Sequence, residues 1–373
     1  MTTADAHRGA WRTGAGLGLL ALLLTSCESR QAPTGSGARP PPATTSAPAP
    51  KQLGLPTDTF LDRDAGTELR IVTYNVEWNT IFEDVDARRA AKFARIVTAL
   101  NPDVLVLQEI GMRPQDRGKA GSRKRTAADV LMVCNTVATL PKGRNWQAFQ
   151  GGDNVVVSRY PLKMTADETQ PPGECELALA LVDLPDQRFA VDLYVVGVHF
   201  KCCGGTDNDP QRQQQSDAIV SWLRDARTPG GNIDLPARTP IVVLGDLNIV
   251  GGPRPVETLL SGDISDEAAY GADFKPDWDD TPLTDAHPLH NVLGPDDYTW
   301  RNDNEPYKPG RLDYVVYTDS VLEVTKSFVL NTVTMSEREL RATGLEQFDT
   351  TADGVGKAYD HLPLVVDCRV TGK

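Results

Sequence analysis

The sequence predicts a layered α/β sandwich that contains a mixed sheet. Six short apolar runs, each with an acid, an amide or an imidazole at one end, have the composition of buried strands. In the first four runs the polar group comes last, and in the other two it comes first. If all these groups meet at one edge, the last two strands run opposite to the others. Strands also outnumber helices, which favours a layered sandwich over a regular barrel.

Each of the six runs consists of a strand-like segment and one or two polar residues at the end where that strand leaves the core. They are 71–77 with Asn75 and Glu77, 104–109 with Glu109, 195–199 with His199, 241–248 with Asp246 and Asn248, 311–317 with Asp313, and 360–366 with Asp360 and His361. Further strands are expected at 154–158, 177–182, 189–198 and 321–329. Helices are expected at 85–100 and 210–226, the second with Asp209 as N-cap and Pro210 at the first helical position.

The N-terminal part of the chain predicts export rather than folding. Arg8 and Arg12 precede an uncharged stretch at 15–24 that is too short for a permanent membrane helix, which indicates a secretory leader over 1–27. The following Leu-Thr-Ser-Cys27 resembles a bacterial lipoprotein cleavage box, which implies lipidation of Cys27 at the cell envelope. Glu28 is compatible with the outer membrane; an ordinary secreted protein is the alternative. Residues 28–68, rich in Pro, Ser, Thr and Ala, are expected to form a disordered tether before a domain at 69–373.

Composition and charge limit the classes of partner. The 373 residues, 40% apolar and 24% charged, suffice for one large core or two modest ones, and the net charge of −13 repels polyanions. One basic segment opposes this charge and could hold a nucleic acid locally. It contains Arg113, Arg117, Lys119, Arg123, Lys124 and Arg125, with only Asp116 against them. A merely solvated loop is the alternative interpretation.

The cysteines leave a pairing question open. Beyond Cys27 the chain has Cys134, Cys175, Cys202, Cys203 and Cys368, an odd number that leaves at least one unpaired. Zinc binding by His199, Cys202 and Cys203 lacks a second pair of ligands at the usual spacing. A disulfide or a structural role at the rim of a site is therefore favoured for this adjacent pair.

The polar residues at the strand ends point to hydrolysis by an activated water. In Gly245-Asp246-Leu-Asn248, a carboxylate and an amide two residues apart point the same way. Asp313 is suited to hold His361 in one tautomer, and His199 is a second imidazole. Asn75, Glu77 and Glu109 offer the hard oxygen donors that suit Mg²⁺ or Mn²⁺. The chain has neither a GxGxxG nor a GxxxxGK[ST] motif, which argues against dinucleotide and P-loop chemistry.

The ordered set Asn-x-Glu, Gln-Glu, Val-His, Gly-Asp-x-Asn, Arg-Leu-Asp-Tyr and Asp-His resembles the endonuclease/exonuclease/phosphatase (DNase I-like) superfamily over about residues 69–368. That superfamily includes DNase I, abasic-site endonucleases, neutral sphingomyelinases and inositol polyphosphate phosphatases. The resemblance implies a four-layer α/β/β/α sandwich, with two mixed, mainly antiparallel sheets flanked by helices. It also implies hydrolysis of a phosphoester by a metal-assisted water.

The resemblance assigns a role to each matching residue. The implied metal ligands are Glu109, Asn75, Glu77 and Asp360. Asp246 would orient or deprotonate the attacking water, and Asn248 and His199 would hold the phosphate oxygens. His361, paired with Asp313, would act as general base or electrostatic stabiliser. Thr299 would contact the phosphate. Two departures concern the substrate: residues 110–112 separate Glu109 from the first arginine, and the segment 200–205 is an insertion beside His199 in which Lys201 could meet a phosphate.

Three functions remain open from the sequence. The first is a nuclease or phosphodiesterase at the cell envelope, with the basic segment gripping a nucleic-acid backbone. The second is a phosphoesterase of small or lipid-linked substrates, similar to sphingomyelinases or inositol phosphatases. The third is a binding lipoprotein without catalysis. Every expected catalytic residue type is present, which argues against this third function.

Overall fold

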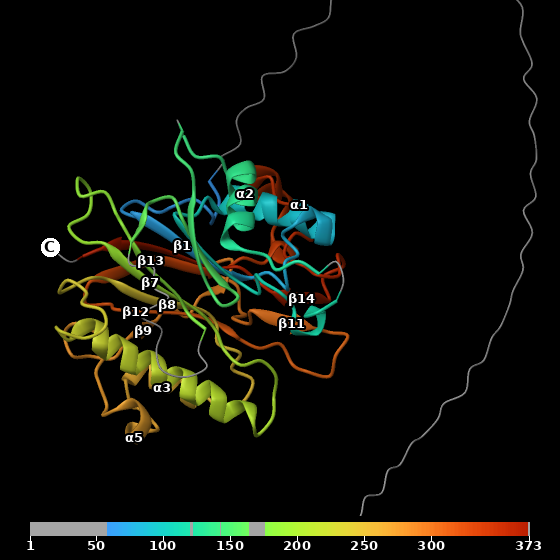
Figure 1. Cartoon of the computed structure of the whole chain (residues 1–373). Coiled ribbons are helices and arrows are strands. Elements are labelled where there is room, and N and C mark those ends of the chain that lie inside the picture. The colour runs from blue at the N-terminus through green and yellow to red at the C-terminus, as the bar shows by residue number, and fades with distance from the viewer. Residues whose placement is uncertain (1–57, 120–121, 142, 164–175, 372–373) are drawn as a thin grey trace, which may run out of the picture. The chain divides into compact units, whose positions relative to one another are not determined.

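Two β-sheets lie face to face at the centre of the domain, with helices on both outer sides (Figure 1). The computed structural model describes residues 58–119, 122–141, 143–163 and 176–371. The leader with Cys27, the tether up to residue 57, and Cys175 lie outside the described residues. The layered α/β/β/α arrangement predicted from the sequence is confirmed.

The first sheet has seven strands, in the order β10-β13-β15-β1-β2-β4-β3. Its strands are β10 (Leu289–His290), β13 (Leu322–Val329), β15 (Leu364–Val370), β1 (Leu69–Asn75), β2 (Val104–Gln108), β4 (Asn154–Ser158) and β3 (Gln147–Gly151). Only the β1/β2 and β10/β13 pairs within it are parallel. The sheet is therefore mixed and mainly antiparallel, as predicted.

The second sheet has six strands, in the order β5-β6-β7-β8-β12-β9. They are β5 (Leu162–Lys163), β6 (Ala178–Val182), β7 (Leu193–His199), β8 (Ile241–Asp246), β12 (Asp313–Tyr317) and β9 (Thr284–Asp285). Within it only β7 and β8 are parallel. A separate two-stranded sheet, β11 (Trp300–Asn302) with β14 (Ala358–His361), completes the β structure of the described residues.

The helices cover the outer faces of the two sheets. On the side of the first sheet lie α1 (Glu83–Leu100) and α2 (Ala127–Val137), and on the side of the second lies α3 (Asn208–Arg227) (Figure 1). The shorter helical segments are η1 (Pro114–Asp116), α4 (Arg254–Ser261), α5 (Glu267–Tyr270), η2 (Thr332–Thr334) and α6 (Glu337–Thr343). In the described part of the chain, no helix combines the length and apolarity required to cross a membrane.

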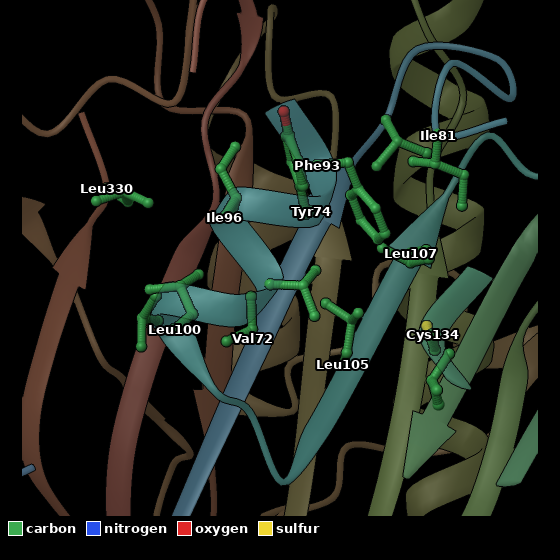
Figure 2. Packing of buried hydrophobic residues seen from close by; sticks show 14 of the residues in the cluster. Val72, Tyr74, Ile81, Phe93, Ile96, Leu100, Leu105, Leu107, Cys134 and Leu330 are labelled. Atoms are coloured by element: carbon green, nitrogen blue, oxygen red, sulfur yellow. The ribbon is translucent and has the colours of Figure 1, made fainter. Parts of the chain in front are cut away.

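Strand alternation divides the core into layers. Val72 and Tyr74 of β1 pack against Phe93 and Ile96 of α1, as Figure 2 shows. The preceding residue, Ile71, faces the opposite way, into the cluster shared by the two sheets. A third cluster joins the second sheet to α3. Because both faces of each sheet are buried, the strands read as continuous apolar runs rather than alternating ones.

Several boundaries differ from the predicted ones. Leu61 is buried in the cluster beneath α1, so the folded domain begins before Leu69 and the tether is shorter than predicted. The last predicted run is divided: His361 ends β14, and β15 begins only at Leu364. Helix α3 begins at Asn208, and Asp209 lies inside it as the ion-pair partner of Arg212 rather than at the N-cap.

Candidate active site

Most of the predicted polar residues meet at one edge of the two stacked sheets. Within the second sheet, the register places Asp246 of β8 between His199 of β7 and Asp313 of β12. Strand β12 runs antiparallel to β8, so its first residue lies beside the last residue of β8, as the order of polar and apolar residues predicted. In the first sheet, Asn75 is the last residue of β1 and lies beside the end of β2.

Asn75 links the two sheets at this edge. Its Nδ2 donates hydrogen bonds to Glu109 Oε1 and to Asp246 Oδ2, both at 3.1 Å. Glu109 is held further by the backbone N–H of Trp78, which donates to its Oε2 at 2.9 Å. The Asn75 side chain is fully buried. The site therefore depends on how the two sheets are stacked and not on either sheet alone.

His361 and Asp313 form a buried imidazole–carboxylate pair. Nδ1 of His361 donates to Asp313 Oδ2 at 2.7 Å, which leaves Nε2 facing Asp246 Oδ2 at 3.6 Å. Thr299 positions this pair from behind, since its hydroxyl oxygen accepts the backbone N–H groups of Leu312 and Asp313, both at 2.9 Å. Thr299 is fully buried, so these contacts give it a positioning role; its predicted contact with phosphate stays a prediction.

His199 forms a second pair, with a residue that the sequence analysis missed. Its Nδ1 donates to Asp153 Oδ2 at 2.9 Å, and its Nε2 faces Asp246 Oδ2 at 3.6 Å. Asp153 lies in the tight turn between β3 and β4, and its carbonyl oxygen accepts the N–H of Ile110 at 2.9 Å. The available signal was the Gly151-Gly152-Asp153 turn immediately before a predicted strand.

Asp246 is the centre of the network. Its Oδ2 accepts hydrogen bonds from Asn75 and from Nδ2 of Asn248, the latter at 3.0 Å, while Oδ1 accepts the Asn248 N–H at 2.8 Å. Gly245 allows β8 to lie this close to β7, because its φ is +145° and an added Cβ would lie 1.9 Å from the carbonyl oxygen of Val198. Any side chain at residue 245 would therefore displace Asp246.

Two of the predicted ligands lie apart from this network. Glu77 is partly exposed and forms an ion pair with Arg89 of α1. Asp360 is half-buried on β14 opposite Arg301, and its charge acts on Glu109 without a direct hydrogen bond to it. Asn75 presents its amide nitrogen, not its oxygen, to Glu109. The metal-ligand roles of Glu77, Asp360 and Asn75 remain predictions.

Burial and charge shift the pKa values in this site in opposite senses. Burial is the main cause that raises the pKa of Glu109 and of Asp246, which the charges of the two imidazoles partly offset. Burial opposes protonation of His199, but the hydrogen bond and charge of Asp153 and the charges of Asp246 and Glu109 raise its pKa to about 9. Burial likewise opposes protonation of His361, yet Asp313 and Asp246 raise its pKa well above the ordinary value. Both shifts favour the protonated, cationic form of the rings.

The donor set fits a divalent cation. Ligand atoms of Asp246, Asp313 and His361 lie within 4.8 Å of one another, and Asp313 Oδ1 is buried without a hydrogen-bond partner. Among the described residues, neither Glu109 nor Asp246 pairs with a lysine or arginine. Buried carboxylates that pair with neither lysine nor arginine are suited to a hard ion such as Mg²⁺ or Mn²⁺.

A cavity of about 620 Å³ adjoins the site beyond Glu77. Its wall includes Arg113 and Arg125, from the segment that the sequence singled out as basic. Much of that charge is matched locally: Arg125 is buried against Asp84 and the ring of Phe82, Arg123 pairs with Asp129, and Lys119 pairs with Asp116. The described part of the segment is thus less basic toward solvent than its composition suggests.

A buried oxygen cluster flanked by two carboxylate-held imidazoles, at the edge of a two-sheet sandwich, defines a hydrolase that attacks with water. The Endonuclease/Exonuclease/phosphatase family matches residues 72–334, and the chain belongs to this family. The chain is accordingly a hydrolase of phosphoester bonds. No curated protein sequence matches it.

Solved structures of the same kind resemble the chain at low sequence identity. The human nocturnin catalytic domain with bound sulfate anion is 14% identical, with 81% of this chain and 94% of that chain covered and a TM-score of 0.47. D. rerio TDP2 complexed with a single-strand DNA product is 16% identical, covering 81% and 98%, with a TM-score of 0.46. Beta toxin from Staphylococcus aureus is 15% identical, covering 80% and 99%, with a TM-score of 0.46.

Proposed function

We propose that the chain is a phosphodiesterase that requires Mg²⁺ or Mn²⁺ and that its substrate is a nucleic acid. The observation that carries this proposal is the convergence on Asp246: one carboxylate oxygen accepts from two amides and faces two cationic imidazoles. A phosphodiester is anionic, so attack by water requires both a proton acceptor and neutralisation of charge. The site supplies both within a few ångströms.

The charge of each side chain indicates its role in the hydrolysis. Asp246, whose pKa is raised by burial, is suited to orient the attacking water and accept its proton. His361 and His199 are cationic at neutral pH, which favours a role in stabilising the phosphate oxygens over a role as general base. Glu109, the main metal ligand that the family resemblance implies, would hold the cation, which when bound would neutralise further negative charge on the reacting phosphate.

Hydrolysis of plasmid DNA and of bis-p-nitrophenyl phosphate tests this function. We expect activity with Mg²⁺ or Mn²⁺, none with chelator, and a loss of orders of magnitude in Asp246→Asn, which keeps the shape of the side chain. Asp186→Asn, at an exposed carboxylate in the loop that precedes β7, is the matched control and should remain fully active. Near-normal turnover in Asp246→Asn would refute the mechanism.

The salt dependence of DNA binding tests the basic segment. Arg117 and Lys124 are exposed and make no ion pair in the described part of the chain, unlike Arg123 and Arg125. If each binds one phosphate, replacing both with Gln should reduce the slope of log K against log salt concentration by about two. An unchanged slope would mean that the segment is only a solvated loop and does not bind DNA.

A second function is favoured by the cavity beyond Glu77. Its volume suits a small substituent, and its arginines are largely matched by acids, which fits a small or lipid-linked phosphoester better than a polymer. Cleavage of bis-p-nitrophenyl phosphate without cleavage of DNA would select this alternative. Cleavage of neither substrate would favour a binding protein.

We further propose that the enzyme acts at the cell envelope, held by lipid on Cys27. The support is the leader sequence and its resemblance to a lipoprotein cleavage box. Cys27→Ser should move the protein from the membrane fraction to the soluble fraction, and mass spectrometry of the mature N-terminus should find the lipid on the unaltered chain. Membrane association that survives Cys27→Ser would exclude this anchor.

A further inference from the structure

Two adjacent thiols lie on the loop that follows β7, at the rim of the active site. Cys202 and Cys203 are exposed and free, and their Sγ atoms are 2.7 Å apart. The other described cysteines, Cys134 and Cys368, are buried in two different hydrophobic clusters. Among the cysteines that the structure describes, Cys202 and Cys203 can therefore bond only to each other.

We propose that Cys202 and Cys203 are a reversible redox site, which closes to a disulfide between neighbouring residues and thereby slows the enzyme. The oxidant is a disulfide-bonded compound, protein or small molecule. One cysteine thiolate attacks a sulfur of that disulfide, forming a mixed disulfide and releasing one thiolate. The second cysteine thiolate then displaces the other half. The pair loses two protons and two electrons, and the acceptor disulfide becomes two thiols.

Adjacency makes this bond labile rather than structural. Successive Cα atoms are about 3.8 Å apart across a trans peptide, whereas disulfides join Cα atoms about 4.4–6.8 Å apart. The closed ring must therefore distort its peptide, and strained, exposed disulfides are the easily reduced ones. Desolvation by the surrounding loop and the neighbouring Cys203 thiol raise the pKa of Cys202 to about 11, so exchange should become faster as the pH rises.

The loop is tied to the site through its backbone. The N–H of Phe200 donates to the carbonyl oxygen of Asp246 at 2.8 Å, and Asn248 Nδ2 donates to the carbonyl oxygen of Phe200 at 3.1 Å. Behind the loop, the buried Arg212 donates to the carbonyl oxygens of Lys201 and Cys203 at 2.7 and 2.9 Å. These contacts belong to the dithiol form.

Closing the ring rotates the peptide between Cys202 and Cys203, which lies between the two carbonyl oxygens that Arg212 holds, and so shifts the flanking peptides that carry them. The shift reaches Phe200 and, through it, Asn248 and Asp246. A small misplacement of a reacting group is costly for turnover. The effect on turnover rests on the proposed function, whereas the disulfide itself does not.

Peptide mapping of the full chain tests the redox site directly. After equilibration with oxidised or reduced glutathione and blocking of free thiols, trypsin releases residues 202–212 as one peptide that contains both cysteines. We expect this peptide to lack two hydrogen atoms and to escape alkylation after oxidation, and to carry two blocking groups after reduction. Two free thiols under both conditions, or a cross-link to the peptide with Cys175, would overturn the proposal.

Turnover of bis-p-nitrophenyl phosphate tests the regulatory half. The oxidised chain should be about tenfold slower than the reduced chain, and Cys202→Ser and Cys203→Ser should each abolish this difference. Cys134→Ser, at a buried thiol, is the matched control and should keep it. Equal rates of the two redox forms would overturn the regulation alone. No hydrolysis by either form would overturn both the regulation and the proposed function. In that case the peptide mapping would still decide whether the redox site exists.

Discussion

The two imidazole–carboxylate pairs face the same oxygen atom from structures of different kinds. Nε2 of His361 and Nε2 of His199 each lie 3.6 Å from Asp246 Oδ2. Asp313, the partner of His361, is fully buried at the start of a strand, whereas Asp153, the partner of His199, is 21% exposed in a turn. Strand register thus positions one carboxylate, and a hairpin turn positions the other. The two pairs should therefore differ in how much activity is lost when the carboxylate is replaced.

The largest effect is expected at the buried pair. Asp313→Asn keeps the volume but can donate to His361, which favours the wrong tautomer and removes the charge that keeps the ring cationic. We expect kcat to fall by about 10³-fold or more, by analogy with other carboxylate-oriented histidines. Steady-state hydrolysis of bis-p-nitrophenyl phosphate measures this, and an unchanged melting temperature confirms that the fold persists.

The exposed pair should be more tolerant. In Asp153→Asn, water can reach His199 and replace part of the lost hydrogen bond, so kcat should fall by only about tenfold. The same assay, run beside Asp313→Asn and the Asp186→Asn control, measures the ratio. Equal losses in the two variants would show that burial of the partner does not distinguish the pairs.

Coupling between the pairs is expected to be smaller still. His199→Gln and His361→Gln remove two cations that act on one carboxylate, so their effects on the activation free energy should not add. We expect the double variant to deviate from the sum of the single variants by about 1 kcal/mol. A double-mutant cycle on kcat/KM measures the deviation, and strict additivity would mean that the two imidazoles act independently.

The last expected effect concerns stability rather than turnover, measured against pH in the presence of chelator. The pKa of His199 rises from its ordinary 6.5 to about 9 on folding. A raised pKa in the folded state stabilises the fold fully below pH 6.5, and this contribution is lost as the pH rises through 9. Denaturant unfolding should therefore show a falling free energy of unfolding across this range, with a smaller fall in Asp153→Asn. An equal fall in both proteins would assign it to other groups.

The parts of the site on regular strands could be predicted from the sequence, and the parts on turns could not. The predicted strand at 154–158 coincides with β4, and Asp246 ends β8 as predicted. Asp153 could not be predicted in the same way, because a turn residue has no periodic pattern to mark it. The pairing of Glu77 with Arg89 depends on the path of the chain into α1, which composition does not reveal.

Helix α2 was missed for a related reason. It is short, begins directly after the basic segment, and buries few apolar residues, among them Val130 and Cys134. A capping box was nonetheless visible, because Thr126 and Asp129 cap each other's backbone N–H groups at the start of the helix. Local capping patterns would have identified this helix where hydrophobic periodicity over a short stretch did not.

The position of the last strand has a consequence for when the enzyme becomes active. Strand β15, the final strand of the described chain, pairs with both β1 and β13 and lies near the middle of the seven-stranded sheet. A nascent chain that has not yet released this segment leaves β1 with an open edge and His361 without its anchor. Assembly of the active site must therefore wait until this segment has been synthesised and has paired with β1 and β13.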